Sequence, residues 1–119
     1  MRFRVQGVDH VAFGVADQRA SEAFYRDVLG LERAHEGAWG DTPLAMMAEH
    51  GGMALFKEAG RGNGFRHMAF RVDRENFELA REDLREAGIE FEIEHHHVSE
   101  SLYFVDPDGN RLELTTYDV

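Results

Sequence analysis

The sequence predicts an α+β fold in which one structural unit occurs twice. The segment DHVAFGV at residues 9–15 recurs as RHMAFRV at 66–72, so that His10 is repeated 57 positions later as His67. Each copy alternates apolar and other residues, as a strand does, and is followed by an apolar pattern of helical period and then by shorter strand-like runs. A repeat of this kind indicates a duplicated module.

The two copies are expected to form one domain, residues 1–119, with module 1 over about 5–57 and module 2 over about 64–118. The residues between them, 58–64, are rich in glycine, which is typical of a linker. A chain of this length buries roughly two thirds of the surface that its unfolded state exposes. It therefore needs no disulfide or other crosslink to be stable.

The element after each strand is expected to be a helix with a capped start and a glycine at its end. Asp17 and Asp73 stand at N-cap positions, and Gly30 and Gly88 follow the last helical residues. Apolar residues at helical spacing should pack both helices onto one face of the strands. These residues are Ala20, Phe24 and Val28 in the first helix and Phe77, Ala80, Leu84 and Ala87 in the second.

A hairpin is expected near the end of the chain, where SLYFV and NRLELTT flank the turn sequence DPDG. A three-residue loop with a left-handed Gly109 pairs Tyr103 with Glu113. Leu114 then packs toward the helix, and Glu113 points to the other side of the strand.

The same alternation places His10, His67 and Glu113 on the strand faces opposite the helices. Two duplicated half-sheets that curl toward each other would enclose these side chains in a cavity. A buried carboxylate is costly unless it is paired or binds a metal, and two histidines with one carboxylate form the ligand set of non-haem Fe(II), Mn(II) and related sites. The sequence therefore predicts a divalent metal site, with Fe(II) or Mn(II) favoured and Zn, Ni or Co also open.

Four segments in this order, VDHVAFGVAD, AFYRDVLGLE, FRHMAFRVD and SLYFVDPDGNRLEL, resemble the vicinal oxygen chelate superfamily. That group includes glyoxalase I, fosfomycin-resistance proteins, extradiol dioxygenases and bleomycin-binding proteins. The resemblance implies two βαβββ modules in a U-shaped mixed sheet around a metal held by His10, His67 and Glu113. It also implies a homodimer, with the metal site either within one chain or between two.

Differences from individual family members bear on the reaction. Glyoxalase I has a fourth carboxylate ligand at the position of Phe56, which disfavours its proton-transfer chemistry here. Fosfomycin thiol transferases have a hydroxyl residue where this chain has Ala12. Extradiol dioxygenases share the His-His-Glu set and a tyrosine at the position of Tyr103, but His50 is the only nearby counterpart of their acid/base histidine before the second ligand.

The leading hypothesis is a metal-dependent enzyme that acts on a small oxygenated substrate, most like a single-domain extradiol dioxygenase. Tyr103 and a histidine of the HHH run, His95 or His97, would hydrogen-bond the substrate oxygens and move protons. Two alternatives stay open: a thiol transferase or lyase of the glyoxalase I or fosfomycin-resistance type, and a non-enzymatic protein that binds a bleomycin-like small molecule. The candidate substrate-pocket residues are Met46, Phe56, Ser101 and Trp39.

Composition limits the partners. With 13 Lys and Arg against 23 Asp and Glu the net charge is −10, which is unfavourable for binding nucleic acid or an anionic membrane. The absence of cysteine excludes disulfides and thiolate chemistry, and no apolar run reaches the roughly 20 residues that span a bilayer. We expect a soluble, cytoplasmic protein whose partner is a small molecule.

Overall fold

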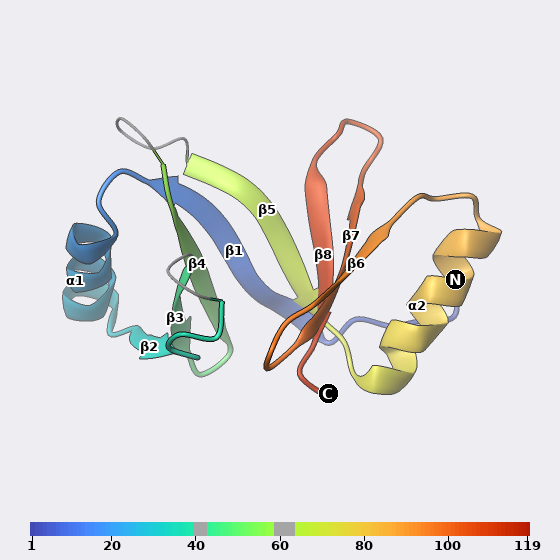
Figure 1. Ribbon diagram of the computed structural model, residues 1–119, viewed down its shortest axis with the longest axis horizontal. Helices are drawn as coiled ribbons and strands as arrows, with labels where there is room; N and C mark the ends of the chain where they lie inside the picture. The colour runs from blue at the N-terminus through green and yellow to red at the C-terminus, as the bar shows by residue number, and fades with distance from the viewer. Residues whose placement is uncertain (40–42, 59–63) are drawn as a thin grey trace. The chain divides into compact units, whose positions relative to one another are not determined.

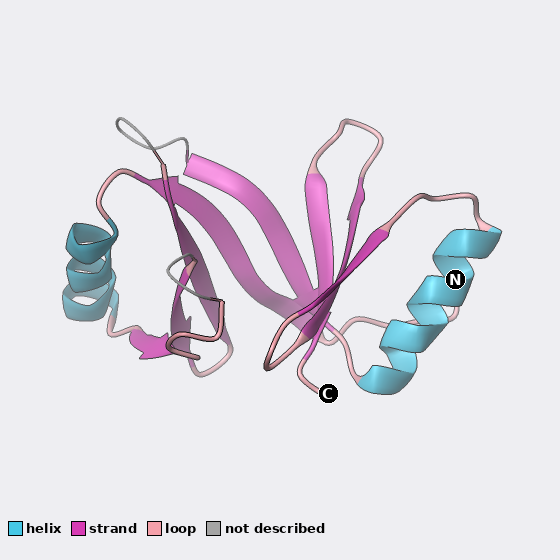
Figure 2. Cartoon of the chain, in the orientation of Figure 1, coloured by secondary structure: helices cyan, strands magenta, loops and turns pink. Residues whose placement is uncertain are grey.

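The computed structural model describes residues 1–39, 43–58 and 64–119. Among these residues it contains two helices and a mixed sheet of eight strands, as expected for an α+β fold (Figure 1, Figure 2). Most of the predicted linker, residues 59–63, lies outside the described residues. No helix in the described part of the chain is long and apolar enough to cross a membrane.

The elements repeat the order strand, helix and three strands, as the sequence predicts. The first series is β1 (Gly7–Val15), α1 (Gln18–Leu29), β2 (Glu32–Ala34), β3 (Leu44–Ala48) and β4 (Gly51–Lys57). The second series is β5 (Gly64–Arg71), α2 (Arg74–Glu86), β6 (Glu92–His95), β7 (Glu100–Val105) and β8 (Arg111–Thr116).

Close contacts divide the chain into two compact units. One is Asp9–His67, and the other combines Met1–Val8 with Met68–Val119. The boundaries between the units fall within two strands: after Val8 in β1 and after His67 in β5. The module boundaries expected from the sequence repeat stay a prediction.

In the unit Asp9–His67 the strands lie in the order β2-β3-β4-β1. Strand β1 is parallel to β4, and the other neighbours are antiparallel. Phe13 packs against the core of this unit, so the alternation of β1 directs His10 to the other face. The buried residues of this core are Leu31, Leu44, Met46 and Leu55.

Helix α1 begins and ends as predicted. The Asp17 side chain accepts a hydrogen bond of 3.1 Å from the Ala20 N–H. Gly30 follows the helix with φ 72°, a left-handed conformation that only glycine adopts without strain. Local sequence signals are sufficient for both ends because each end is stabilised by residues within one turn.

The residues that helix α1 turns toward the strands are not the ones that the sequence predicts. Phe24 and Val28 are 55% and 61% exposed, and no residue of α1 is buried. The aromatic ring of Tyr25 reaches the core instead. The expected packing of the stripe containing Ala20, Phe24 and Val28 is therefore wrong, because helical periodicity identifies a stripe but not the surface that covers it.

In the second unit the strands lie in the order β5-β8-β7-β6, with β5 parallel to β8. Helix α2 buries the predicted residues Phe77, Ala80 and Leu84. The Asp73 side chain accepts a hydrogen bond of 2.8 Å from the Asn76 N–H at the start of this helix. The core that the helix completes consists of Val72, Phe77, Ala80, Leu84, Leu102 and Leu114.

The hairpin between β7 and β8 also matches the prediction. The Asp106 N–H donates a hydrogen bond of 3.0 Å to the Asn110 carbonyl, and Gly109 has φ 86°. Tyr103 lies opposite Glu113. Leu114 packs toward α2, and Glu113 therefore points to the opposite face.

The N-terminal residues are attached to α2 by a carboxylate that the sequence did not single out. Asp83 is buried and accepts hydrogen bonds from the backbone N–H groups of Arg2 (2.5 Å) and Phe3 (3.0 Å) and from Arg2 Nε (2.8 Å). Burial raises the pKa of Asp83, but the hydrogen bonds from Phe3 and Arg2 outweigh it and lower the pKa to about 2. Asp83 is therefore ionised at neutral pH.

Candidate metal centre

Two histidines meet in the unit Asp9–His67. The rings of His10, from β1, and His67, from β5, lie edge to face with centroids 5.7 Å apart. His67 is buried, and His10 is partly buried. The His10 Nδ1 atom lies 2.7 Å from the Asp9 Oδ1 atom, and Asp9 is almost completely buried.

The carboxylate of Glu113 lies on β8 of the other unit. Glu113 is buried, and its Oε2 atom accepts a hydrogen bond of 2.7 Å from the Ser101 hydroxyl. Burial and the nearby negative charge of Glu113 raise the pKa of Tyr103 far above its usual value. The phenol of Tyr103 is therefore protonated at neutral pH and can act as a hydrogen-bond donor.

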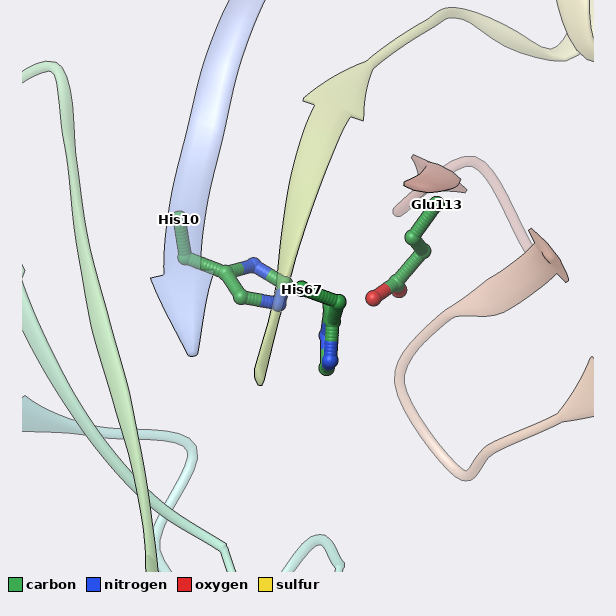
Figure 3. Close-up of side chains that lie close together, drawn as sticks. All are labelled: His10, His67 and Glu113. Atoms are coloured by element: carbon green, nitrogen blue, oxygen red, sulfur yellow. The ribbon is translucent and has the colours of Figure 1, made fainter. Parts of the chain in front are cut away.

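His67 and Glu113 lie on neighbouring strands, β5 and β8, which are paired in the sheet. Ala69 lies opposite Glu113 in the parallel pairing of β5 and β8. His67 is two residues before Ala69, so both side chains project from the same face of β5. One potential ligand atom from each of His10, His67 and Glu113 lies within 4.8 Å of the other two (Figure 3).

The donor set fits a divalent transition metal. Two imidazole nitrogens and one carboxylate oxygen suit Mn, Fe, Co, Ni or Zn better than Ca or Mg. Three protein ligands also leave positions for water or substrate, as in catalytic rather than structural sites. The Glu113 carboxylate is buried, which would be costly without a partner of opposite charge or a metal.

The structure places Met46 differently from the sequence-based expectation. It is 1% exposed and belongs to the core with Leu44 and Leu55. The turn between β3 and β4 contains two residues, whereas the turn between β7 and β8 contains five. Because of this difference of three residues, the offset of 57 that relates the two modules does not hold for β3 and β7. Side chains alternate between the two faces of a strand, so an error of three residues puts Met46 on the face opposite to the one that corresponds to Tyr103.

Phe56 lies beside the histidines. Its ring centroid is 6.0 Å from that of His67, and the Arg66 guanidinium lies 4.4 Å above the Phe56 ring. This residue therefore gives the histidine pair an apolar neighbour. Trp39, by contrast, makes an edge-to-face contact with His35 at 5.4 Å.

One histidine of the HHH run, His95, has a partner other than Glu113. His95 lies opposite Glu100, and its Nδ1 atom is 3.1 Å from the Glu100 Oε2 atom. This pair is on the face of β6 and β7 that carries Leu102 rather than Tyr103. His97 is exposed in the segment after β6. The structure therefore places His95 on the strand face opposite to that of Tyr103.

Asp9 was not recognised as a site residue from the sequence. The available signal was a carboxylate directly before His10 in a strand of mainly apolar residues. Neighbouring residues of a strand point to opposite faces, so a hydrogen bond between Asp9 and His10 is not expected from the alternation. Ser101 was expected to contact substrate, and its observed partner is Glu113.

The fold and the site define a class of protein: a duplicated α+β protein that carries a His-His-Glu group. The chain belongs to the Glyoxalase/Bleomycin resistance protein/Dioxygenase superfamily, whose family model matches residues 7–114. The resemblance seen in the sequence is thereby confirmed.

Three relatives illustrate the similarity. Glutathione transferase FosA from Serratia marcescens is 29% identical over 116 residues, which cover 92% of this chain and 80% of the relative. The Mn(II)-bound glyoxalase from Novosphingobium aromaticivorans is 28% identical with a TM-score of 0.72, and the match covers 98% of this chain and 40% of that one. The 2,3-dioxygenase LapB from Pseudomonas sp. KL28 has a TM-score of 0.78 at 21% identity, over 98% of this chain and 42% of that one. The chain thus spans less than half the length of the last two proteins.

Proposed function

We propose that His10, His67 and Glu113 bind a divalent metal and that the protein transfers a thiol to a small electrophile. The observation that carries the metal site is the proximity of the three ligand-type side chains. The similarity to a glutathione transferase over 92% of the chain supports the thiol-transfer reaction. The pairing of His95 with Glu100 disfavours the dioxygenase role that was expected of this histidine.

The reaction is an addition of a thiol to a strained or polarised carbon–oxygen bond, as in an epoxide. A carbon–sulfur bond forms, the carbon–oxygen bond breaks, and the proton of the thiol ends on the oxygen, so no other reactant is needed. A divalent metal at this site would polarise the substrate oxygen and stabilise the charge that develops on it.

Side chains of the protein would assist in two ways. Tyr103 lies opposite Glu113, and burial raises its pKa even further above neutral pH, so its phenol keeps its proton. Its phenol can therefore donate a hydrogen bond to a substrate oxygen near Glu113. Phe56, beside His67, supplies an apolar wall that would reduce access of water.

The experiment loads the purified, metal-free protein with Mn(II), Ni(II), Zn(II) or Fe(II) and measures binding by isothermal titration calorimetry. Each loaded sample is then assayed with glutathione or cysteine and a panel of epoxides that includes fosfomycin. Glu113→Gln should lose both binding and turnover, and Glu49→Gln, in the exposed turn after β3, should keep both. Full metal affinity in Glu113→Gln would contradict the metal site.

Oxygen uptake tests the competing reaction. Tyr103 opposite Glu113 is also the arrangement that favoured an extradiol dioxygenase. Consumption of O₂ by the Fe(II)-loaded protein with a catechol, without thiol transfer under any metal, would replace the proposed reaction by ring cleavage. Tight binding of a small molecule by the metal-free protein without turnover would instead support a bleomycin-like binding protein.

We also propose, from the sequence resemblance, that the protein is a cytoplasmic homodimer. Light scattering coupled to size-exclusion chromatography measures the mass directly. A mass near 13.6 kDa would show a monomer and contradict the dimer.

A further inference from the structure

We infer that Asp9 is a positioning residue that makes Nε2 the metal-binding atom of His10. The inference rests on the metal site proposed above. It starts from one contact, the distance of 2.7 Å between His10 Nδ1 and Asp9 Oδ1. A carboxylate oxygen can only accept a hydrogen bond, so the Nδ1 atom must carry the proton and donate it.

That proton decides which nitrogen is available to a metal. An imidazole whose Nδ1 carries a proton has its lone pair on Nε2. Because Nδ1 is engaged by Asp9, Nε2 is the ligand atom that His10 contributes to the group with His67 and Glu113.

Burial makes this contact effective. The Asp9 side chain has no exposed surface, and the His10 side chain is 16% exposed. Water therefore competes only weakly for the hydrogen bond. Because few water molecules screen it, the negative charge of the Asp9 carboxylate polarises the His10 imidazole strongly. The negative charge of Asp9 increases the electron density at Nε2, which strengthens its bond to a metal.

The contact also restrains the ring. A histidine on a strand can rotate about its χ2 bond and exchange the positions of its two nitrogens. Rotation by half a turn would break the Asp9 hydrogen bond, which would leave a buried carboxylate with one hydrogen bond fewer. Asp9 therefore orients His10 before a metal binds.

The first test measures metal affinity in three variants. Asp9→Ala removes the hydrogen bond and the charge, and we expect a loss of about 10- to 100-fold in affinity, the usual cost of removing an outer partner of a metal ligand. Asp9→Asn keeps an oxygen acceptor without the charge, so its affinity should fall between those of the wild type and Asp9→Ala. Asp27→Ala is the matched control, because Asp27 also pairs with its sequence neighbour, Arg26, but is exposed on α1.

The second test identifies the ligand atom directly. In Zn(II)-loaded protein with ¹⁵N-labelled histidine, NMR should show a protonated Nδ1 and a zinc-bound Nε2 for His10. Zinc at Nδ1 overturns the inference, and this result does not depend on whether an Asp9 variant folds. Equal affinity in the wild type and a folded Asp9→Ala also overturns it. If the wild type binds no metal, the proposed function fails first, which separates the two failures.

Discussion

The Ser101 hydroxyl donates a hydrogen bond of 2.7 Å to the Oε2 atom of Glu113, and both side chains are buried. The pairing of β7 with β8 creates this contact. Tyr103 lies directly opposite Glu113, and Ser101 is the diagonal neighbour on the same face. One carboxylate oxygen is thus held by the protein, which sets the direction of the other.

Ser101→Ala should weaken both stability and metal binding. Loss of this hydrogen bond to a buried carboxylate should lower the free energy of unfolding by about 1–3 kcal/mol. Metal affinity should fall by roughly tenfold or more, because the carboxylate loses an orienting partner. Urea denaturation and calorimetry measure the two effects. Ser21→Ala, on the partly buried side of α1, is the control, and a Ser101→Ala protein that matched it in both measurements would contradict this role.

Asp83 should make stability depend on pH in the acid range. Its pKa is lowered from 3.8 to about 2 in the folded protein, so folding is favoured by its ionised form. The contribution is fully present above about pH 4 and is lost as the pH falls toward 2. Urea denaturation between pH 2 and 5 should show a smaller loss of stability with falling pH in Asp83→Asn than in the wild type. Parallel curves for the two proteins would show that the N-terminal residues do not hold Asp83 ionised.

Replacing a phenylalanine by alanine should lower the free energy of unfolding strongly on one helix and hardly at all on the other. Phe77 on α2 is fully buried, so Phe77→Ala should cost about 3–5 kcal/mol. Phe24 on α1 is 55% exposed, so Phe24→Ala should stay within roughly 0.5 kcal/mol of the wild type. The midpoints of denaturation measure both. A large cost for Phe24→Ala would show that the stripe on α1 is covered in solution.

The neighbouring methionines of β3 test the register of the first hairpin. Met46 is 1% exposed in the core, and Met46→Ala should cost about 2–5 kcal/mol. Met47 is opposite Gly52, which is itself opposite His10, and it is only partly buried. Met47→Ala should therefore be clearly less destabilising. Reversed effects would mean that β3 is shifted by one residue and that Met46 lies on the face of His10.

The sequence alone was sufficient for most of the local structure. The repeat and the alternation of residues predicted the order of elements, the caps at Asp17 and Asp73, and the pairing of Tyr103 with Glu113. It also singled out the three side chains that the structure brings together. Each of these features depends on residues that are close in the chain or related by a constant offset, so a pattern in the sequence can record them.

Only the tertiary structure decided which faces are covered and which polar groups meet. The apolar stripe of α1 is exposed, and Met46 is in the core because the turn at Glu49 and His50 is three residues shorter than its counterpart. The pKa of buried Asp83 is lowered because Phe3 and Arg2, 80 and 81 positions away, donate hydrogen bonds to it. Periodicity describes the chemistry along one element, whereas burial and hydrogen bonding depend on which distant segment packs against it.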